Sequence, residues 1–327
     1  MSDAVPVINL SRYLSGDAQG KASVAREVAG ACESSGFFKI ANHGVPQALI
    51  DDAFATAGAF FAQPAAVKDS FRPPRSASAR GYHALETKNL AKTIGYNNPA
   101  DLREQFYLGP LTSRAADFAH IPGASELYAE NIWPDTPASY RPVFTAYYQA
   151  LESLGRSLMS VFALALDMPE GYFDDKINRH FSTVPANHYP EPKGDPLPNQ
   201  IRAGEHTDFG SLTILAVSDA AGGLQVKLRD GTWSDVTAPR DEFIVNIGDM
   251  MQRWTNDRWL SNLHRVVNPP PEHRAGSRRM SIGYFLHPNY DAEIACLATC
   301  SGPDNPARYP PVRAGDMMRK KLEARAA

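Results

Sequence analysis

The feature that most constrains the fold is a run of short, strand-like segments in the C-terminal half of the chain. Gly222-Gly223 and Asp230-Gly231 provide turns within this run, and Asp-Gly between two apolar segments is a strong hairpin signal. Closely spaced short strands with turn signals are typical of a sandwich or jelly roll. The segments lie near residues 180–189, 210–218, 223–228, 242–247, 262–267 and 279–286.

The N-terminal half alternates between helical and strand-like patterns. Apolar spacing predicts helices over residues 22–34, 46–63 and 137–167, and a further helix over 312–326. Strands are predicted over 5–10, 36–45 and 103–109, whereas 70–100 and 110–136 are predicted to be irregular. We therefore expect a mainly β fold with flanking helices. A region spanning 1–120 is expected to pack on a core spanning 121–327, so that the two form one structural unit.

Bulk properties exclude several classes of protein. The 327 residues carry a net charge of -3, which argues against a nucleic-acid-binding surface. The most apolar helix-like stretch, Leu154 to Met168, is interrupted by Arg156 and Asp167, so no membrane span is predicted. Three cysteines make no disulfide framework in a chain of this length, and we expect reduced thiols in a cytoplasmic protein. No motif indicates an oligomer, and a monomer is expected.

The triplet His206-Thr207-Asp208 could contribute two ligands to a metal, and His264 a third. Two imidazoles and a carboxylate form the facial triad of non-heme Fe(II) oxygenases, which leaves three coordination positions open. The triplet alone is weak, because 9 His and 36 acidic residues in 327 predict about one such triplet by chance. Its context adds weight, since His206 and His264 both adjoin strand-like runs.

Arg279 and Ser281 follow on the next predicted strand. Because they are two residues apart, their side chains point to the same face of that strand. A guanidinium beside a hydroxyl can bind a carboxylate. This pair therefore predicts a binding site for an acidic cosubstrate near the metal.

Two groups of motifs resemble one known family in content and order. In the C-terminal half they are Asn187-His188-Tyr189-Pro190, His206-Thr207-Asp208-Phe209-Gly210, Asn246-Ile247-Gly248-Asp249, His264-Arg265-Val266 and Arg279-Met280-Ser281. In the N-terminal half they are Val5-Pro6-Val7-Ile8-Asn9-Leu10, Gly36-Phe37-Phe38-Lys39-Ile40-Ala41-Asn42-His43-Gly44-Val45, Arg80-Gly81-Tyr82 and Arg103-Glu104-Gln105-Phe106. Over nearly its whole length, the chain resembles the isopenicillin N synthase-like family of 2-oxoglutarate/Fe(II)-dependent dioxygenases.

The resemblance implies a fold and a metal centre. The fold would be a double-stranded β-helix, which is a jelly-roll core with helices packed on one side. The metal would be Fe(II), bound by His206, Asp208 and His264. With O2 and 2-oxoglutarate, such a centre would hydroxylate, desaturate or cyclise a small-molecule substrate and release succinate and CO2.

The resemblance also implies residues for the cosubstrate and the substrate. Arg279 and Ser281 would hold the C5 carboxylate of 2-oxoglutarate, and Tyr189 would donate its hydroxyl to the same group. Asn187 would be a neighbour of the cosubstrate. His188, between them, would face the opposite side of the strand and is not predicted to be a ligand. Candidates for the substrate pocket, by family position alone, are Arg80, Tyr82, Phe106 and Phe285.

Three alternatives stay open at the level of sequence. A relative could activate O2 without 2-oxoglutarate, so that Arg279 and Ser281 hold a carboxylate of the substrate instead. An ethylene-forming enzyme of the same fold would fragment 2-oxoglutarate itself. A non-catalytic metal-binding jelly roll is the third alternative, and an intact triad with an intact Arg-Ser pair disfavours it.

Overall fold

A computed structural model describes residues 5–74, 78–192, 194–218 and 222–326. Within these ranges the strands form a large sheet of order β1-β2-β10-β7-β12-β5-β4-β3 and a smaller sheet of order β6-β11-β8-β9. From β5 to β12 the chain moves back and forth between the two sheets, which is the arrangement of a double-stranded β-helix. The predicted fold class is confirmed.

The bounds of the elements are as follows. The strands of the large sheet are β1 (Val7–Asn9), β2 (Phe37–Ala41), β3 (Gly81–His83), β4 (Glu104–Leu108), β5 (Val184–Tyr189), β7 (Leu212–Val217), β10 (Phe243–Ile247) and β12 (Arg279–Leu286). Those of the small sheet are β6 (Ala203–His206), β8 (Leu224–Lys227), β9 (Trp233–Asp235) and β11 (His264–Val266), and a separate pair is β13 (Glu293–Ile294) with β14 (Val312–Arg313). The helices are α1 (Ser11–Leu14), α2 (Ala18–Ser34), α3 (Gln47–Phe61), α4 (Ala65–Asp69), α5 (Ala124–Leu127), α6 (Tyr140–Ala165), α7 (Asp174–Ile177), α8 (Asp249–Trp254) and α9 (Ala314–Ala326), with 3-10 turns η1 (Leu90–Ile94), η2 (Ala115–Phe118), η3 (Pro271–His273) and η4 (Ala298–Cys300).

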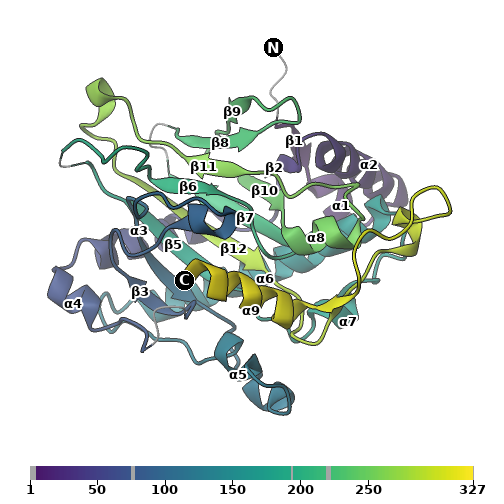
Figure 1. Ribbon diagram of the computed structural model, residues 1–327, viewed down its shortest axis with the longest axis horizontal. Coiled ribbons are helices and arrows are strands. Elements are labelled where there is room, and N and C mark those ends of the chain that lie inside the picture. The colour runs from purple at the N-terminus through teal and green to yellow at the C-terminus, as the bar shows by residue number, and fades with distance from the viewer. Residues whose placement is uncertain (1–4, 75–77, 193, 219–221, 327) are drawn as a thin grey trace.

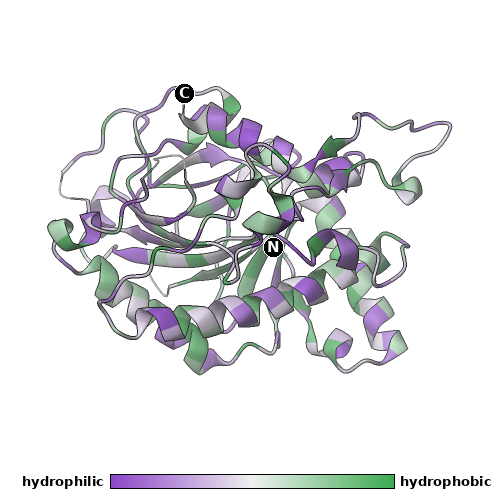
Figure 2. Ribbon diagram, turned by 90° about the horizontal axis from the view of Figure 1, so that it is seen from below, coloured by the Kyte–Doolittle hydropathy of each residue, from purple (hydrophilic) through white to green (hydrophobic). Residues whose placement is uncertain are grey.

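Helices α2, α3 and α6 pack together, and α3 and α6 also contact strands of the large sheet. Along α6 the buried residues recur at helical spacing, as with Phe144, Tyr148, Leu151 and Leu158. Figure 2 shows that the helices carry both green, hydrophobic and purple, hydrophilic segments, as expected when one face of a helix is buried. Helix α9, drawn in yellow, crosses in front of the sheets in the view of Figure 1.

Two apolar cores lie on the two faces of the large sheet. Phe243, Val245 and Ile247 of β10 belong to the cluster that includes α2, α3 and α6. Ile244, which points the other way, belongs to a second cluster made with residues of the small sheet, such as Val226. Because neighbouring residues of a strand face opposite sides, β10 contributes to both clusters.

Most predicted elements are present, with bounds that differ by a few residues. The predicted hairpin at Asp230-Gly231 joins β8 and β9, which pair in an antiparallel manner. The region 70–100 was expected to be irregular, yet it contains β3 and η1, and 110–136 contains short helical turns. These pieces are too short to produce a recognisable period. The C-terminal helix begins at Ala314, because Val312 and Arg313 form β14.

Strand β6 was not predicted, although it carries a key residue. It pairs with β11, with His206 opposite His264 and Ala203 opposite Val266. The register shifts between these pairs, because three steps along β6 match two along β11. In the described ranges no helix is both long and apolar enough to cross a membrane.

Candidate metal centre and cosubstrate pocket

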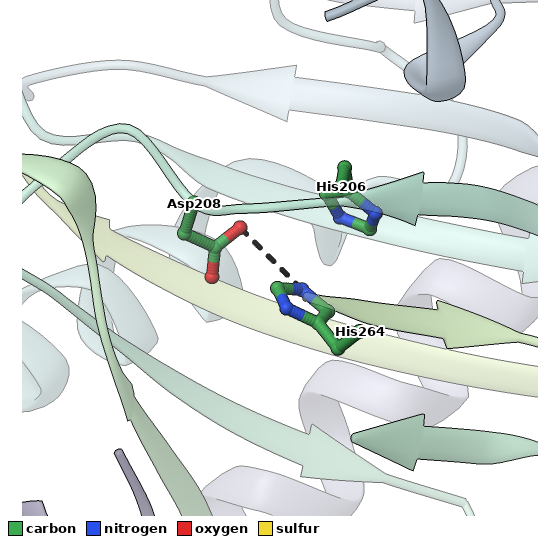
Figure 3. Close-up of side chains that lie close together, drawn as sticks. All are labelled: His206, Asp208 and His264. Carbon is green, nitrogen blue, oxygen red and sulfur yellow. Dashed lines mark ion pairs between the residues drawn. The ribbon is translucent and has the colours of Figure 1, made fainter. Parts of the chain in front are cut away.

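His206, Asp208 and His264 lie together in the structure. His206 ends β6, His264 begins β11, and Asp208 lies in the turn from β6 to β7. One possible ligand atom from each residue lies within 4.8 Å of the other two. Nε2 of His264 is 3.7 Å from Oδ1 of Asp208, and Figure 3 shows the three side chains converging. Two imidazoles and a carboxylate in this arrangement are suited to bind Fe(II) on one face.

Each of the two imidazoles is held by a backbone carbonyl. Nδ1 of His206 donates to the carbonyl of Gly204 at 2.7 Å, and Nδ1 of His264 donates to that of Asn262 at 3.2 Å. A proton on Nδ1 makes Nε2 the nitrogen that can coordinate a metal. The ring of His264 also packs edge-on against Phe37, with ring centroids 5.5 Å apart.

The carboxylate of Asp208 is also held by hydrogen bonds, in this case from two side chains. Its Oδ2 accepts hydrogen bonds from the hydroxyl of Thr213 at 2.5 Å and from the amide of Asn246 at 2.7 Å. Its Oδ1 is the oxygen nearest to His264. The hydrogen bonds to Oδ2 therefore leave Oδ1 free to face the two imidazoles and a metal between them.

A glycine allows the turn after Asp208 to pack tightly. At Gly210 an added Cβ would lie 2.4 Å from the carbonyl oxygen of Leu286 and 2.6 Å from Nδ1 of His287. Since the first contact is with backbone, a side chain could not be accommodated without moving β12 or the turn. Gly210 therefore lets the turn that carries Asp208 pack directly against the end of β12.

The predicted carboxylate-binding residues meet across strands β5 and β12. Arg279 pairs with Tyr189, and Ser281 pairs with Asn187. Nδ2 of Asn187 donates to Oγ of Ser281 at 3.3 Å, and the guanidinium carbon of Arg279 lies 5.0 Å from the ring centroid of Tyr189. All four predicted residues therefore share one face of the large sheet.

Arg279 is buried without a complete set of partners. The residue is only 3% exposed, and its Nη1 has no hydrogen-bond partner among the described residues. Burial lowers the pKa of Arg279, while Tyr189 beside it acts in the opposite direction. An unpartnered N–H of a buried guanidinium is costly unless an anionic ligand completes it, so the site fits a carboxylate.

His188 faces the opposite side of the sheet, as predicted from alternation. Its Nδ1 hydrogen-bonds Oε1 of Glu104 at 2.8 Å, and its ring stacks on Phe61. Lys68 and Tyr82 also bond Glu104, at 2.8 and 2.5 Å. None of these four polar residues belongs to the cavity wall that includes His206 and Asp208.

A cavity of about 530 Å³ adjoins the metal centre. Its wall includes His206 and Asp208, and helix α9 closes part of it. Next to the metal ligands are the aromatic rings of Phe181, Phe285 and His287, of which Phe181 and His287 stack at 5.1 Å. Burial lowers the pKa of His287 to about 3, so this imidazole is neutral. Other residues of the wall include Arg103, Gln105, Tyr107, Met318 and Leu322.

The four candidate substrate residues have different positions. Phe285 and Arg80 line the cavity. The guanidinium of Arg80, however, donates to three backbone carbonyls at 2.8 to 2.9 Å, so it supports the wall. Tyr82 and Phe106 face the helices instead, where Phe106 packs on Phe60 with ring centroids 4.9 Å apart. The assignment of Tyr82 and Phe106 to the pocket is therefore withdrawn.

Several residues of the site were missed in the sequence. Gln105 and Tyr107 line the cavity, and the alternation of β4 around Phe106 was the signal that could have located them. Asn246 was noted only as part of a motif, although it holds Asp208. His287 and the residues of α9 carry no local pattern that distinguishes them from other surface or core positions.

Comparisons with known proteins agree with this geometry. Residues 5–136 match the family model described as the non-haem dioxygenase in morphine synthesis N-terminal region, and residues 180–288 match the 2OG-Fe(II) oxygenase superfamily. The 2-oxoglutarate-Fe(II) type oxidoreductase hxnY of Emericella nidulans is 33% identical over 97% of this chain and 88% of its own length.

Solved structures with a similar fold also come from this family. A 2OG-Fe(II) oxygenase family protein from Caulobacter crescentus superposes with a TM-score of 0.83 at 31% identity, covering 98% of this chain and 99% of that one. A full-length Neurospora crassa protein, solved in complex with alpha-KG (2-oxoglutarate), gives a TM-score of 0.84 at 27% identity, covering 98% and 96%. The predicted family, cofactors and class of enzyme are confirmed: the chain belongs to the 2OG-Fe(II) oxygenase superfamily and is a 2-oxoglutarate- and Fe(II)-dependent dioxygenase.

Proposed function

We propose that the protein oxidises a small, ring-containing substrate at an Fe(II) ion bound by His206, Asp208 and His264. The observation that carries this proposal is the convergence of three ligand atoms at the wall of a cavity, each residue being held by hydrogen bonds from behind. When bound, the iron supplies the activation of O2, coupled to decarboxylation of 2-oxoglutarate to succinate and CO2.

The second part of the proposal concerns the cosubstrate. Arg279 and Ser281 hold the C5 carboxylate, and Tyr189 donates its hydroxyl to it. Support comes from the shared face of these residues and from the N–H of Arg279 that has no partner among the residues the structure describes. Asn187 acts on the hydroxyl of Ser281, which it contacts at 3.3 Å, and thereby positions it.

The substrate is proposed to lie against Phe181, Phe285 and His287. These rings form a wall beside Asp208, and aromatic walls favour the flat faces of ring compounds. The neutral imidazole of His287 provides a polar contact without adding charge. The Neurospora crassa protein has also been solved with thymine, a flat ring, which is consistent with this class of substrate.

The surrounding residues have supporting roles. Thr213 and Asn246 keep Oδ1 of Asp208 directed at the metal position. Met318 and Leu322 of α9 cover the cavity with apolar groups, which restricts water near the reacting centre. Three free cysteines agree with a reducing, cytoplasmic location, which we also propose, together with a monomeric state that light scattering can test.

The proposal is tested by adding 2-oxoglutarate to the Fe(II)-loaded protein without oxygen. Chelation by the keto acid produces a weak visible charge-transfer band, and we expect this band for the wild type. Its absence would favour the oxidase alternative, in which 2-oxoglutarate is not used. A library of ring and acyclic compounds, assayed for succinate above the uncoupled rate, then identifies the substrate class. If only acyclic compounds stimulate succinate release, the role given to the aromatic wall is wrong.

The mass of the product distinguishes the remaining reaction types. Hydroxylation adds an oxygen atom, and desaturation or ring closure removes two hydrogen atoms. Ethylene in the headspace, formed without any added substrate, would instead identify fragmentation of 2-oxoglutarate.

A further inference from the structure

A second arginine lies close to Arg279. Arg202 immediately precedes β6, so it comes from the side of the small sheet, and it is only 2% exposed. Its Nη2 donates to the carbonyl of Ser277 at 2.6 Å and to the hydroxyl of the same residue at 3.1 Å. Ser277 is two residues before Arg279, the first residue of β12, so Arg202 reaches from the small sheet to the start of the strand that carries Arg279.

The electrostatic environment agrees with this proximity. Burial lowers the pKa of Arg202, and the positive charge of Arg279 lowers it further. Tyr189 interacts with both arginines. Like charges repel, so two buried guanidiniums in range of each other are unfavourable unless an anion lies near both.

The described residues do not supply that anion. The buried carboxylate of Asp101 pairs with a third arginine, Arg103, at 3.2 Å. No described carboxylate forms an ion pair with Arg202 or Arg279, and each keeps an N–H without a partner, Nε in Arg202 and Nη1 in Arg279. The protein therefore buries more positive charge here than it neutralises, which is the property of a preformed anion site.

We propose that Arg202 is a second positioning residue for the cosubstrate, placed on the opposite side of the C5 carboxylate from Arg279. This inference rests on the proposed function of the Arg279 site and adds to it. Arg202 makes the distal end of the site doubly cationic, so it favours a 2-oxo acid with a second carboxylate over one without. Its hydrogen bonds to Ser277 hold the guanidinium in place while leaving Nε for the anion.

The experiment compares two ligands of equal chain length. 2-Oxoglutarate carries the distal carboxylate, and 2-oxopentanoate lacks it. Both are titrated without oxygen into Fe(II)-loaded wild type and into Arg202→Met, and binding is followed by the charge-transfer band. We expect Arg202→Met to weaken 2-oxoglutarate binding about tenfold or more, as for loss of a charge-assisted hydrogen bond, and to change 2-oxopentanoate binding little.

Two control variants separate electrostatics from structure. Ser277→Ala removes the side-chain partner of Arg202 but keeps the charge, and Arg265→Met removes an arginine of the small sheet that pairs with Glu205 instead. Arg265→Met should leave the preference for 2-oxoglutarate unchanged, whereas Ser277→Ala should retain most of it, because the carbonyl of residue 277 still accepts from Arg202. If Arg202→Met weakens both ligands equally, Arg202 acts only through packing and the inference is wrong; unchanged affinity for both also overturns it. If wild type shows no band with 2-oxoglutarate, the proposed function itself fails.

A double-mutant cycle provides an independent measure, also in case Arg202→Met folds poorly. Arg202→Lys keeps a charge on a shorter stem, and Arg279→Lys does the same at the second position. Because the two residues are proposed to share one carboxylate, their effects on the 2-oxoglutarate dissociation constant should not multiply. Strictly multiplicative effects would indicate that the two arginines act on different groups.

Discussion

Strands β4 and β5 carry buried polar side chains on both of their faces. The two faces differ in how completely these polar groups are hydrogen-bonded by neighbouring residues. On the helical face, Glu104 receives hydrogen bonds from Lys68, Tyr82 and His188. On the pocket face, the neighbouring strand β12 contributes Arg279, one N–H of which finds no partner within the described part of the chain. Burial alone therefore does not distinguish a structural polar group from a binding group.

The difference lies in whether the protein completes its own hydrogen bonds. A satisfied buried network stabilises one conformation, and a change within it affects folding. A network left incomplete in the described residues costs stability until a ligand completes it. Changes on the helical face should therefore alter stability, and changes on the pocket face should alter ligand affinity.

The largest effect is expected for Asp208→Ala, on the pocket side. Loss of one of three ligands should abolish bound iron and reduce turnover by more than about a thousandfold, whereas the jelly-roll core should remain folded. Metal analysis, an activity assay and circular dichroism measure these three properties. His206→Ala should behave in the same way. Full iron content and full activity in Asp208→Ala would show that the ligand assignment is wrong.

On the helical face, Glu104→Gln should reduce the free energy of unfolding by about 3 kcal/mol, because it leaves Lys68 buried without its counter-charge. Urea unfolding measures this loss. The affinity for 2-oxoglutarate in the folded variant should stay close to that of wild type. A stable variant with weakened 2-oxoglutarate binding would contradict the division between the two faces.

The pH dependence of the same variant sharpens this test. Burial on its own raises the pKa of Glu104, but hydrogen bonds from His188, Lys68 and Tyr82 outweigh it, and the net pKa lies below the ordinary value. The stabilisation is therefore complete above the unfolded pKa of about 4.3 and is lost as the pH falls through the folded pKa. The stability difference between wild type and Glu104→Gln should shrink over that acidic range.

A smaller effect is expected for Arg279→Lys. Lysine retains the charge but loses the planar, two-pronged geometry that matches a carboxylate. The KM for 2-oxoglutarate should rise about tenfold, equivalent to about 1.4 kcal/mol. Iron content should not change, because Arg279 is not a proposed ligand. An unchanged KM would indicate that this arginine holds a carboxylate of the substrate.

The smallest effect is expected for Tyr189→Phe, which removes only a hydroxyl. Because Arg279 still provides the charge, affinity for 2-oxoglutarate should fall only about threefold to fivefold, as for loss of a single hydrogen bond. The thermal midpoint should stay near that of wild type. A lowered midpoint with unchanged affinity would move Tyr189 from the binding group to the structural group.

The sequence predicted the elements that have a period or a distinctive motif. Helix α6 and the hairpin at Asp230-Gly231 follow from local patterns, and the three proposed iron ligands follow from motif order. Partners across space could not be predicted in this way. Arg202 and Ser277 are 75 positions apart, and only the arrangement of the two sheets brings them together.

Tyr82 and Phe106 illustrate a different kind of failure. Both residues lie in motifs that resemble the family, and both motifs form strands. Motif position, however, does not specify which face of a strand a side chain occupies. A shift of one residue changes the face, so Gln105 and Tyr107 line the cavity and Phe106 does not.

The shifted register between β6 and β11 has a genetic consequence. His206 reaches its position opposite His264 because three steps of one strand match two of the other. Deleting a single codon between Ala203 and His206 would remove the extra step, and the imidazole would then point away from Asp208 even though every residue of the centre is still encoded. Substitutions at Glu205 would leave that register unchanged. This short segment should therefore tolerate substitutions far better than insertions or deletions.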